Sequence, residues 1–217
     1  VSTASCILVL TTPGDLSFTA IYSGDENFNG SSSPAETHTV ESAPGFTSST
    51  QTNFVVNNSS SYTVETTGYP DVAITMSSNP PLPASIHFID SGGSSNSAIL
   101  SGTPLAGDSG IYQLIFTATN SIGAVTQNFM LEISEAPVIT SSNQTVFVEN
   151  NQKSFTITSR GNPVPVIDLQ GNLPAGITYK DNGDGSAILS GAPQAGSAGI
   201  YPLTILAHST VLPNAQQ

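Results

Sequence analysis

The stretch AILSGTP at residues 98–104 returns 89 positions later as AILSGAP at residues 187–193. A self-similar period of this length indicates tandem copies of one domain rather than a single large fold. The offset between matching residues falls from 93 to 89 along the copies, so the first copy has about four extra residues. We place them in the Ser/Gly/Pro-rich residues 77–95, because loops tolerate insertions. The other matching stretches are residues 43–49 with 136–142, 51–55 with 144–148, 68–70 with 161–163 and 110–112 with 199–201.

Each copy consists of short runs in which Val, Ile, Leu, Phe and Thr alternate with polar residues, separated by turn residues. Such a period of two with frequent turns predicts an all-β chain of tandem β-sandwiches. We expect domain boundaries near residues 42 and 135, with no sheet running across the second boundary. The expected strands include residues 124–134 in the first copy, residues 145–149 and 199–207 in the second, and residues 4–11 ahead of both.

The stretch from Asp108 to Tyr112 resembles the turn and tyrosine that enter strand F of an immunoglobulin-type sandwich, where the hydroxyl bonds back to nearby backbone. Tyr201 has the same place in the second copy. Two residues after each tyrosine, where antibody domains have a cysteine, this chain has Leu114 and Leu203. Apolar packing therefore replaces the disulfide. The fold class that we predict is all-β, with tandem immunoglobulin-like β-sandwiches.

Four motifs extend this resemblance: the Pro-x-x-Thr-Ser-Ser opening, GNLPAGITY at residues 171–179 of the second copy, the Ser-Gly-Thr/Ala-Pro pair and Gly-Ile-Tyr. Together they resemble the immunoglobulin-like repeats of bacterial surface proteins of the haemagglutinin and cadherin-like types, over roughly residues 43–217. The resemblance implies sandwich domains in stalks and adhesins, without a catalytic site. It implies neighbouring immunoglobulin-like domains of the same or another chain as partners, together with an unidentified surface ligand in adhesion.

Residues 1–41 differ from the two copies. Residues 16–31 resemble the closing half of another bacterial immunoglobulin-like repeat. We therefore expect a partial domain at 1–41, a first sandwich at 42–134 and a second at 135–217 whose last strand is missing. Without an initiator Met, the chain is expected to be a piece of something longer. The alternative is that a neighbouring chain supplies the missing strands.

Composition narrows the function. The net charge of −12 comes from 15 acidic and 3 basic residues, which excludes a phosphate-binding basic patch and hence nucleic acid. The longest apolar run, residues 6–10, is too short to span a bilayer, so we expect no membrane insertion. Cys6 is the one cysteine and cannot form an internal disulfide. A Lys-poor, Ser/Thr/Asn-rich acidic repeat chain is typical of secreted or cell-surface bacterial proteins, which predicts an extracellular location.

Carboxylates at two kinds of place are candidate calcium ligands. Asp181 precedes an Asn-Gly pair, and Asp184 begins an Asp-Gly pair. These residues supply oxygen ligands, but such pairs are also strong hairpin-turn signals. A simple turn is the first interpretation and calcium the alternative. Glu41 and Glu135 precede the Ala-Pro pairs at the two expected boundaries, where calcium stiffens cadherin-type arrays. With one acid at each boundary, a solvated linker carboxylate is the simpler interpretation, and no other cofactor is expected.

Catalysis finds no support in the sequence. Gly107–Gly110 spells a serine-protease-like string, but the second copy has Ala198 in place of Ser109. The three histidines share no spacing with each other or with Cys6 that would hold zinc. We expect a non-enzymatic extracellular stalk, spacer or adhesin fragment. The alternatives are a self-assembling surface fibre completed by strand exchange between chains, and the accessory or carbohydrate-binding region of a secreted enzyme. The absence of Trp weakens the last.

Overall fold

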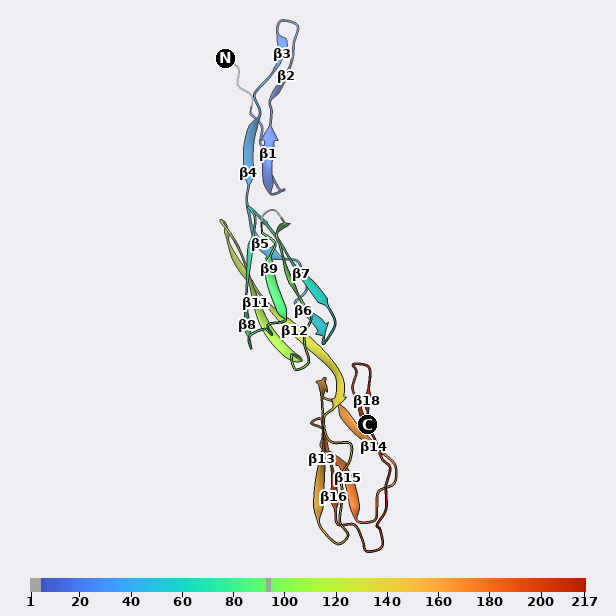
Figure 1. Ribbon diagram of the computed structural model, residues 1–217. Helices are drawn as coiled ribbons and strands as arrows, with labels where there is room; N and C mark the ends of the chain where they lie inside the picture. Colours follow the sequence, from blue (N-terminus) through green and yellow to red (C-terminus); the bar gives the residue numbers. More distant parts are fainter. Residues whose placement is uncertain (1–4, 93–94) are drawn as a thin grey trace.

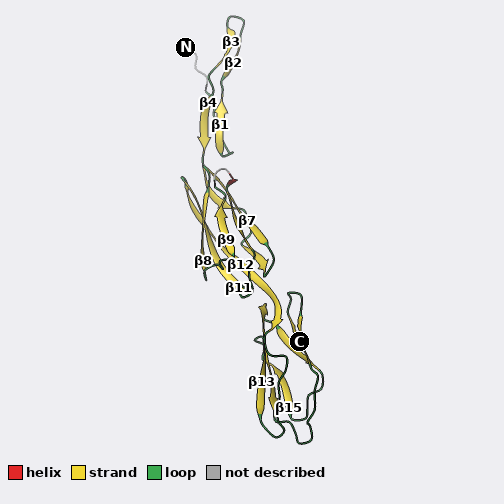
Figure 2. Cartoon of the chain, in the orientation of Figure 1, coloured by secondary structure: helices red, strands yellow, loops and turns green. Residues whose placement is uncertain are grey.

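The protein is described from a computed structural model, which places residues 5–92 and 95–217. Figure 1 shows an extended array, with the N-terminal strands at one end and the C-terminal sandwich at the other. Strands dominate throughout, with a short helical turn at Ser95 and no α-helix in the residues described (Figure 2). The predicted all-β fold of tandem sandwiches is confirmed.

The first sandwich consists of two sheets with the strand order of an immunoglobulin domain. One sheet has the order β5-β7-β10-β9, and the other places β11 between β8 and β12, with β6 parallel to β12. Phe54, Phe116 and Phe129 lie fully buried between the sheets. The strands are β5 (Ser42–Phe46), β6 (Gln51–Val55), β7 (Ser60–Tyr69), β8 (Ala73–Asn79), β9 (Ile86–Asp90), β10 (Ser97–Gly102), β11 (Gly110–Asn120) and β12 (Gly123–Ile139).

The second sandwich repeats this plan with fewer paired strands. One sheet contains β15, β16 and β13, and the other has the order β14-β17-β18. Its smaller buried cluster is centred on Ile157, Ile167 and Leu189. The strands are β13 (Lys153–Asn162), β14 (Val166–Gln170), β15 (Ile177–Asp181), β16 (Ser186–Gly191), β17 (Thr204–His208) and β18 (Ala215–Gln216).

One strand belongs to both sandwiches. β12 pairs with β11 from Gly123 to Ile133 and then with β13 from Glu135 to Ile139. The hydrogen-bonded sheet therefore runs across the junction, and the expectation that it would stop there is wrong. The expected strand at residues 124–134 is likewise longer than predicted. A register shift between Glu135 and Val138 accommodates Pro137, which has no amide hydrogen to donate.

Two expected strands of the second sandwich do not form, or form only in part. Residues 145–149 have no strand, and the strand expected at residues 199–207 is reduced to β17. In the first sandwich, β6 pairs with residues 130–134 of β12, and the start of β11 pairs with residues 130–133. Among the described residues of the second copy, neither segment has a hydrogen-bonded strand partner of this kind.

The N-terminal residues form two small ladders rather than a packed layer. β1 (Gly14–Phe18) pairs with β4 (Glu36–Val40), and β2 (Ile21–Gly24) pairs with β3 (Asn29–Ser32). The expected strand at residues 4–11 is wrong over residues 5–11, which have no regular structure, while residue 4 lies outside the described residues. The buried clusters of the described chain include none of residues 5–41.

The extra residues of the first copy are divided between two places. β8 is two residues longer than its counterpart β14, and the connection after β9 spans residues 91–96 against 182–185 in the second copy. The predicted region of residues 77–95 is thus nearly right. Two of the extra residues lengthen β8, however, and only the other two lie in a loop.

The predicted tyrosine turn is confirmed in both copies. The Tyr112 hydroxyl donates to the Asp108 carbonyl at 2.9 Å, and the Tyr201 hydroxyl donates to the Ser197 carbonyl at 2.8 Å. In the first copy the bond fastens the loop before β11 to β11 itself, and in the second copy it lies within the loop ahead of β17. Leu114 is buried at 1% exposure in the place of the antibody cysteine, so apolar packing does replace the disulfide in the first copy.

Candidate functional site

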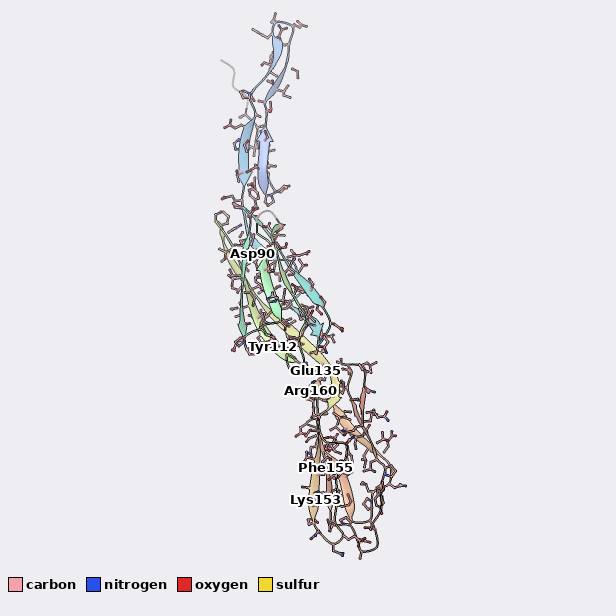
Figure 3. The ribbon with its side chains drawn as sticks, in the orientation of Figure 1. Asp90, Tyr112, Glu135, Lys153, Phe155 and Arg160 are labelled. Atoms are coloured by element: carbon pink, nitrogen blue, oxygen red, sulfur yellow. The ribbon has the colours of Figure 1, made fainter. Side chains whose placement is uncertain are left out.

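Glu135 occupies the point where β12 passes from one sandwich to the other, and its carboxylate contacts both (Figure 3). Oε1 accepts a hydrogen bond from Nε of Arg160, on β13, at 3.0 Å. Oε2 accepts one from Oγ of Ser109, in the loop before β11, also at 3.0 Å. Glu135 therefore joins an element of the first sandwich to an element of the second.

Further side chains fasten the backbone on both sides of Glu135. Nδ2 of Asn162, on β13, donates to the Ile133 carbonyl at 2.9 Å. Nδ2 of Asn53, on β6, donates to Oγ of Ser134 at 2.6 Å. Together with Ser109 and Arg160, these groups surround Glu135; we call Glu135, Arg160, Ser109 and Asn162 the junction cluster. Its members come from three separate elements, so it fixes the direction of β12 between the sandwiches.

Burial makes this ion pair matter more than an ordinary surface pair. The Glu135 side chain is 5% exposed, whereas that of Arg160 is 49% exposed. A buried carboxylate without a partner is strongly unfavourable, whereas the half-exposed guanidinium loses little hydration. Arg160 is one of only 3 basic residues in the chain. The placement of a rare cation opposite a buried acid indicates that the junction depends on it.

The four predicted calcium ligands lie in three separate places in the structure. Glu135 is engaged by Arg160 and Ser109, and Glu41 is exposed between β4 and β5. Asp181 and Asp184 lie in the turn between β15 and β16. Within residues 5–92 and 95–217, no group of three or more His, Cys, Asp or Glu side chains is positioned to hold a metal.

The two turn carboxylates accept hydrogen bonds from the turn itself. Oδ1 of Asp181 accepts from the Gly183 amide at 3.1 Å. Oδ1 of Asp184 accepts from the amide of Ser186 at 3.0 Å and from its hydroxyl at 2.6 Å. These bonds from Ser186 lower the pKa of the Asp184 carboxyl. The arrangement accounts for both residues as turn formers, and calcium binding stays a prediction.

The protease-like string has a structural role. Ser109 donates to Glu135, and Oδ2 of Asp108 accepts from the Leu105 amide and the Ser85 hydroxyl at 2.8 and 2.7 Å. No described histidine forms a hydrogen bond with the loop at residues 107–110. Nε2 of His208 lies 3.0 Å from Oδ2 of Asp168, and both residues belong to the second sandwich. Cys6 is free and exposed.

Sequence reasoning missed two features, of which the repeat could have indicated only the first. Asn57 and Asn150 have positive φ angles of 65° and 60°, a conformation that Asn tolerates. Their backbone N–H groups donate at 2.8 Å to the carbonyls of Pro104 and Pro193, respectively, which are the last residues of the repeated motif. Arg160 was the second omission: an isolated arginine between glycine and serine gives no local signal of its partner.

No family model matches the chain, and no curated protein does. Solved structures resemble it in fold only, at sequence identities of 12–15%. The titin fragment A168–A169 covers 81% of this chain and 96% of its own at 15% identity, with a TM-score of 0.56. The three-domain titin fragment I67–I69, in an E-to-A variant, covers 94% and 72% at 13% identity, with a TM-score of 0.57. The Dpr11 IG1 complex with DIP-gamma covers 80% and 95% at 12% identity, with a TM-score of 0.55. The tandem immunoglobulin-like fold is thus shown.

None of the helical structure in the described residues is long and apolar enough to cross a membrane.

Proposed function

We propose that this chain is a non-enzymatic spacer in an extracellular bacterial surface protein, where it holds another region of that protein at a fixed distance. The observation that carries the proposal is the sharing of β12 by both sandwiches. Domains joined by a flexible linker move relative to each other by default. A continuous strand with a buried ion pair at the crossing removes that freedom, which suits a stalk.

The bacterial surface assignment rests on the motifs shared by the copies and on composition. An acidic chain with 3 basic residues and one cysteine suits a secreted repeat protein that does not depend on disulfides. Both of the motifs that could suggest chemistry, the Gly107–Gly110 string and the acidic turn, are engaged in local hydrogen bonds. Adhesion through a surface ligand is compatible with the same architecture, and the spacer role requires no ligand.

Small-angle X-ray scattering tests the spacer proposal. The wild-type chain should give one narrow distribution of interatomic distances with a constant maximum dimension over a range of salt concentrations. Insertion of Gly-Ser-Gly-Ser between Glu135 and Ala136 should broaden this distribution and shorten the mean interatomic distance. The reason is that β12 could no longer continue from the first sandwich into the second. The same insertion between Asn182 and Gly183, in the exposed part of the turn at residues 182–184, is the control and should change little. A wild-type chain as broad as the junction variant would contradict the proposal.

A further inference from the structure

The turn between β15 and β16 contains a pair of residues that can react with each other. Asn182-Gly183 is one of two Asn-Gly pairs in the chain, and the other is Asn29-Gly30. In such a pair the backbone nitrogen of the glycine can attack the carboxamide carbon of the asparagine side chain and close a succinimide ring. Glycine favours this reaction because it has no Cβ atom to obstruct the approach. The rate at each pair then depends on how freely the fold lets the two groups meet.

The surroundings of Asn182-Gly183 are open. Asn182, Gly183 and Asp184 are all exposed, in the turn that joins the paired strands β15 and β16 (Figure 1). Gly183 has a φ angle of 75°, and a Cβ atom built on it would meet nothing beyond its chain neighbours within 4 Å. The space beside the Gly183 nitrogen is therefore free for the asparagine side chain and for water.

Hydrogen bonds to side chains, rather than strand pairing, hold the two reacting groups. The backbone N–H of Gly183 donates to Oδ1 of Asp181 at 3.1 Å, and Nδ2 of Asn182 donates to Oγ of Ser186 at 2.9 Å. Both bonds lie at the surface and must open before the ring can close. An exposed hydrogen bond contributes little net free energy, because water replaces the lost partner. The turn therefore slows the reaction at Asn182 without preventing it.

The second pair, Asn29-Gly30, is more constrained. Asn29 pairs with Gly24 in the ladder of β2 and β3. A Cβ atom on Gly30 would lie 3.0 Å from the carbonyl oxygen of Tyr22, on the neighbouring strand. Ring closure at Asn29 requires a rotation of the backbone that gives up strand pairing in this crowded place. The fold thus favours reaction at Asn182 over reaction at Asn29.

We propose that Asn182 is the preferred site of spontaneous deamidation in this chain, selected by the fold. In the first step the Gly183 nitrogen forms a bond to Cγ of Asn182, the Cγ–Nδ2 bond breaks, and the Gly183 proton leaves with Nδ2 as ammonia. In the second step water adds to one of the two ring carbonyl carbons derived from Asn182 and breaks its bond to the Gly183 nitrogen. Addition at Cγ gives aspartate, and addition at the backbone carbonyl carbon gives isoaspartate. Water is the one co-reactant that the two steps require.

Either product changes the hairpin of β15 and β16. A carboxylate at position 182 has no N–H group to donate to Ser186, and it adds a negative charge between Asp181 and Asp184. Isoaspartate also adds a carbon to the backbone, beside the bond from the Asn182 N–H to the Ser186 carbonyl at 2.9 Å. β16 supplies Leu189 to the core of the second sandwich, so the modification acts on a hairpin that supports this core. The change needs no enzyme and accumulates with the age of the protein, whether or not the chain is a spacer.

Peptide mapping by mass spectrometry tests the proposal on the intact chain. The folded protein is incubated at mildly alkaline pH, and the peptides that contain Asn182 and Asn29 are compared over time. The Asn182 peptide should gain the mass difference between a carboxyl and a carboxamide group and become a substrate for an isoaspartyl methyltransferase. Asn182 should react at least about fivefold faster than Asn29, the factor for breaking one additional backbone hydrogen bond.

The same incubation in urea separates the effect of the fold from that of the local sequence. Unfolded, the two pairs should react at similar rates, because neither turn nor ladder remains. No conversion at Asn182 in the folded chain, or reaction at Asn29 that is equally fast or faster, would overturn the proposal. A rate ratio that urea leaves unchanged would overturn selection by the fold.

Variants of the turn give a second test. Ser186→Ala removes the acceptor that holds Nδ2 of Asn182 and should speed the conversion by about threefold. Ser61→Ala, on the exposed face of β7, is the matched control and should leave the rate unchanged. Asn182→Gln should abolish the reaction, because its longer side chain cannot close a succinimide ring. Conversion in Ser186→Ala that is no faster than in Ser61→Ala would contradict the geometry on which the proposal rests.

Discussion

At the scale of single residues, Gly102 and Gly191 explain why the repeated motif contains its glycine. A Cβ atom on Gly102 would lie 2.0 Å from the Ser85 carbonyl oxygen, and one on Gly191 would lie 1.9 Å from that of Gly176. Both obstacles are backbone atoms and cannot rotate away. The sequence shows that the glycine recurs, but the reason lies in the turn just ahead of the neighbouring strand, β9 or β15, in each copy. A single sequence does not reveal that contact.

The substitution Gly102→Ala should therefore destabilise the first sandwich by about 3 kcal/mol, the upper range for an overpacked site. Gly123→Ala is the matched control, because its added Cβ meets nothing within 4 Å and its φ is not in the left-handed region. Urea unfolding followed by circular dichroism measures both variants. Equal midpoints for the two variants would show that the collision at Ser85 is relieved by a backbone shift.

At the scale of elements, hydrophobic alternation predicted the strands that have partners within the chain and failed where the partner is missing. Residues 145–149 carry a convincing strand pattern and form none, because a strand needs a hydrogen-bonded neighbour as well as a suitable sequence. The prediction that the sheet stops at the junction failed for a different reason. Ala136-Pro137 has the local signature of a boundary, yet the bulge at this point lets β12 continue through it.

The turn between β15 and β16 is the element on which the calcium prediction depends. We expect a chelator to leave the melting temperature unchanged, because Asp181 and Asp184 already accept hydrogen bonds from Gly183 and Ser186. A ligand that binds only the folded chain must stabilise it, so calcium removal would otherwise lower the melting temperature. A chelator-induced drop that Asp184→Asn abolishes would establish the calcium site. Differential scanning calorimetry with and without chelator decides between these outcomes.

At the scale of the whole molecule, the shared strand couples two sandwiches whose buried clusters differ in size. The first has the larger buried cluster and the second the smaller one. The second sandwich should therefore unfold first on heating. Its connection to the first passes through Glu135 and Arg160, so the strength of that contact sets how far the two transitions separate. The expected division into residues 1–41, 42–134 and 135–217 stays a prediction, and β12 crosses the second of its boundaries.

Replacement of Arg160 tests this coupling. Arg160→Ala leaves the Glu135 carboxylate buried beside Ser109 alone, and we expect a loss of about 2 kcal/mol, as for a hydrogen bond to a charged group. In calorimetry the first transition should move to lower temperature by about 10 °C. Lys180→Ala is the control, since Lys180 is exposed and forms no ion pair among the described residues. If both variants melt alike, the ion pair does not hold the junction, and rigidity would then rest on the continuous backbone of β12.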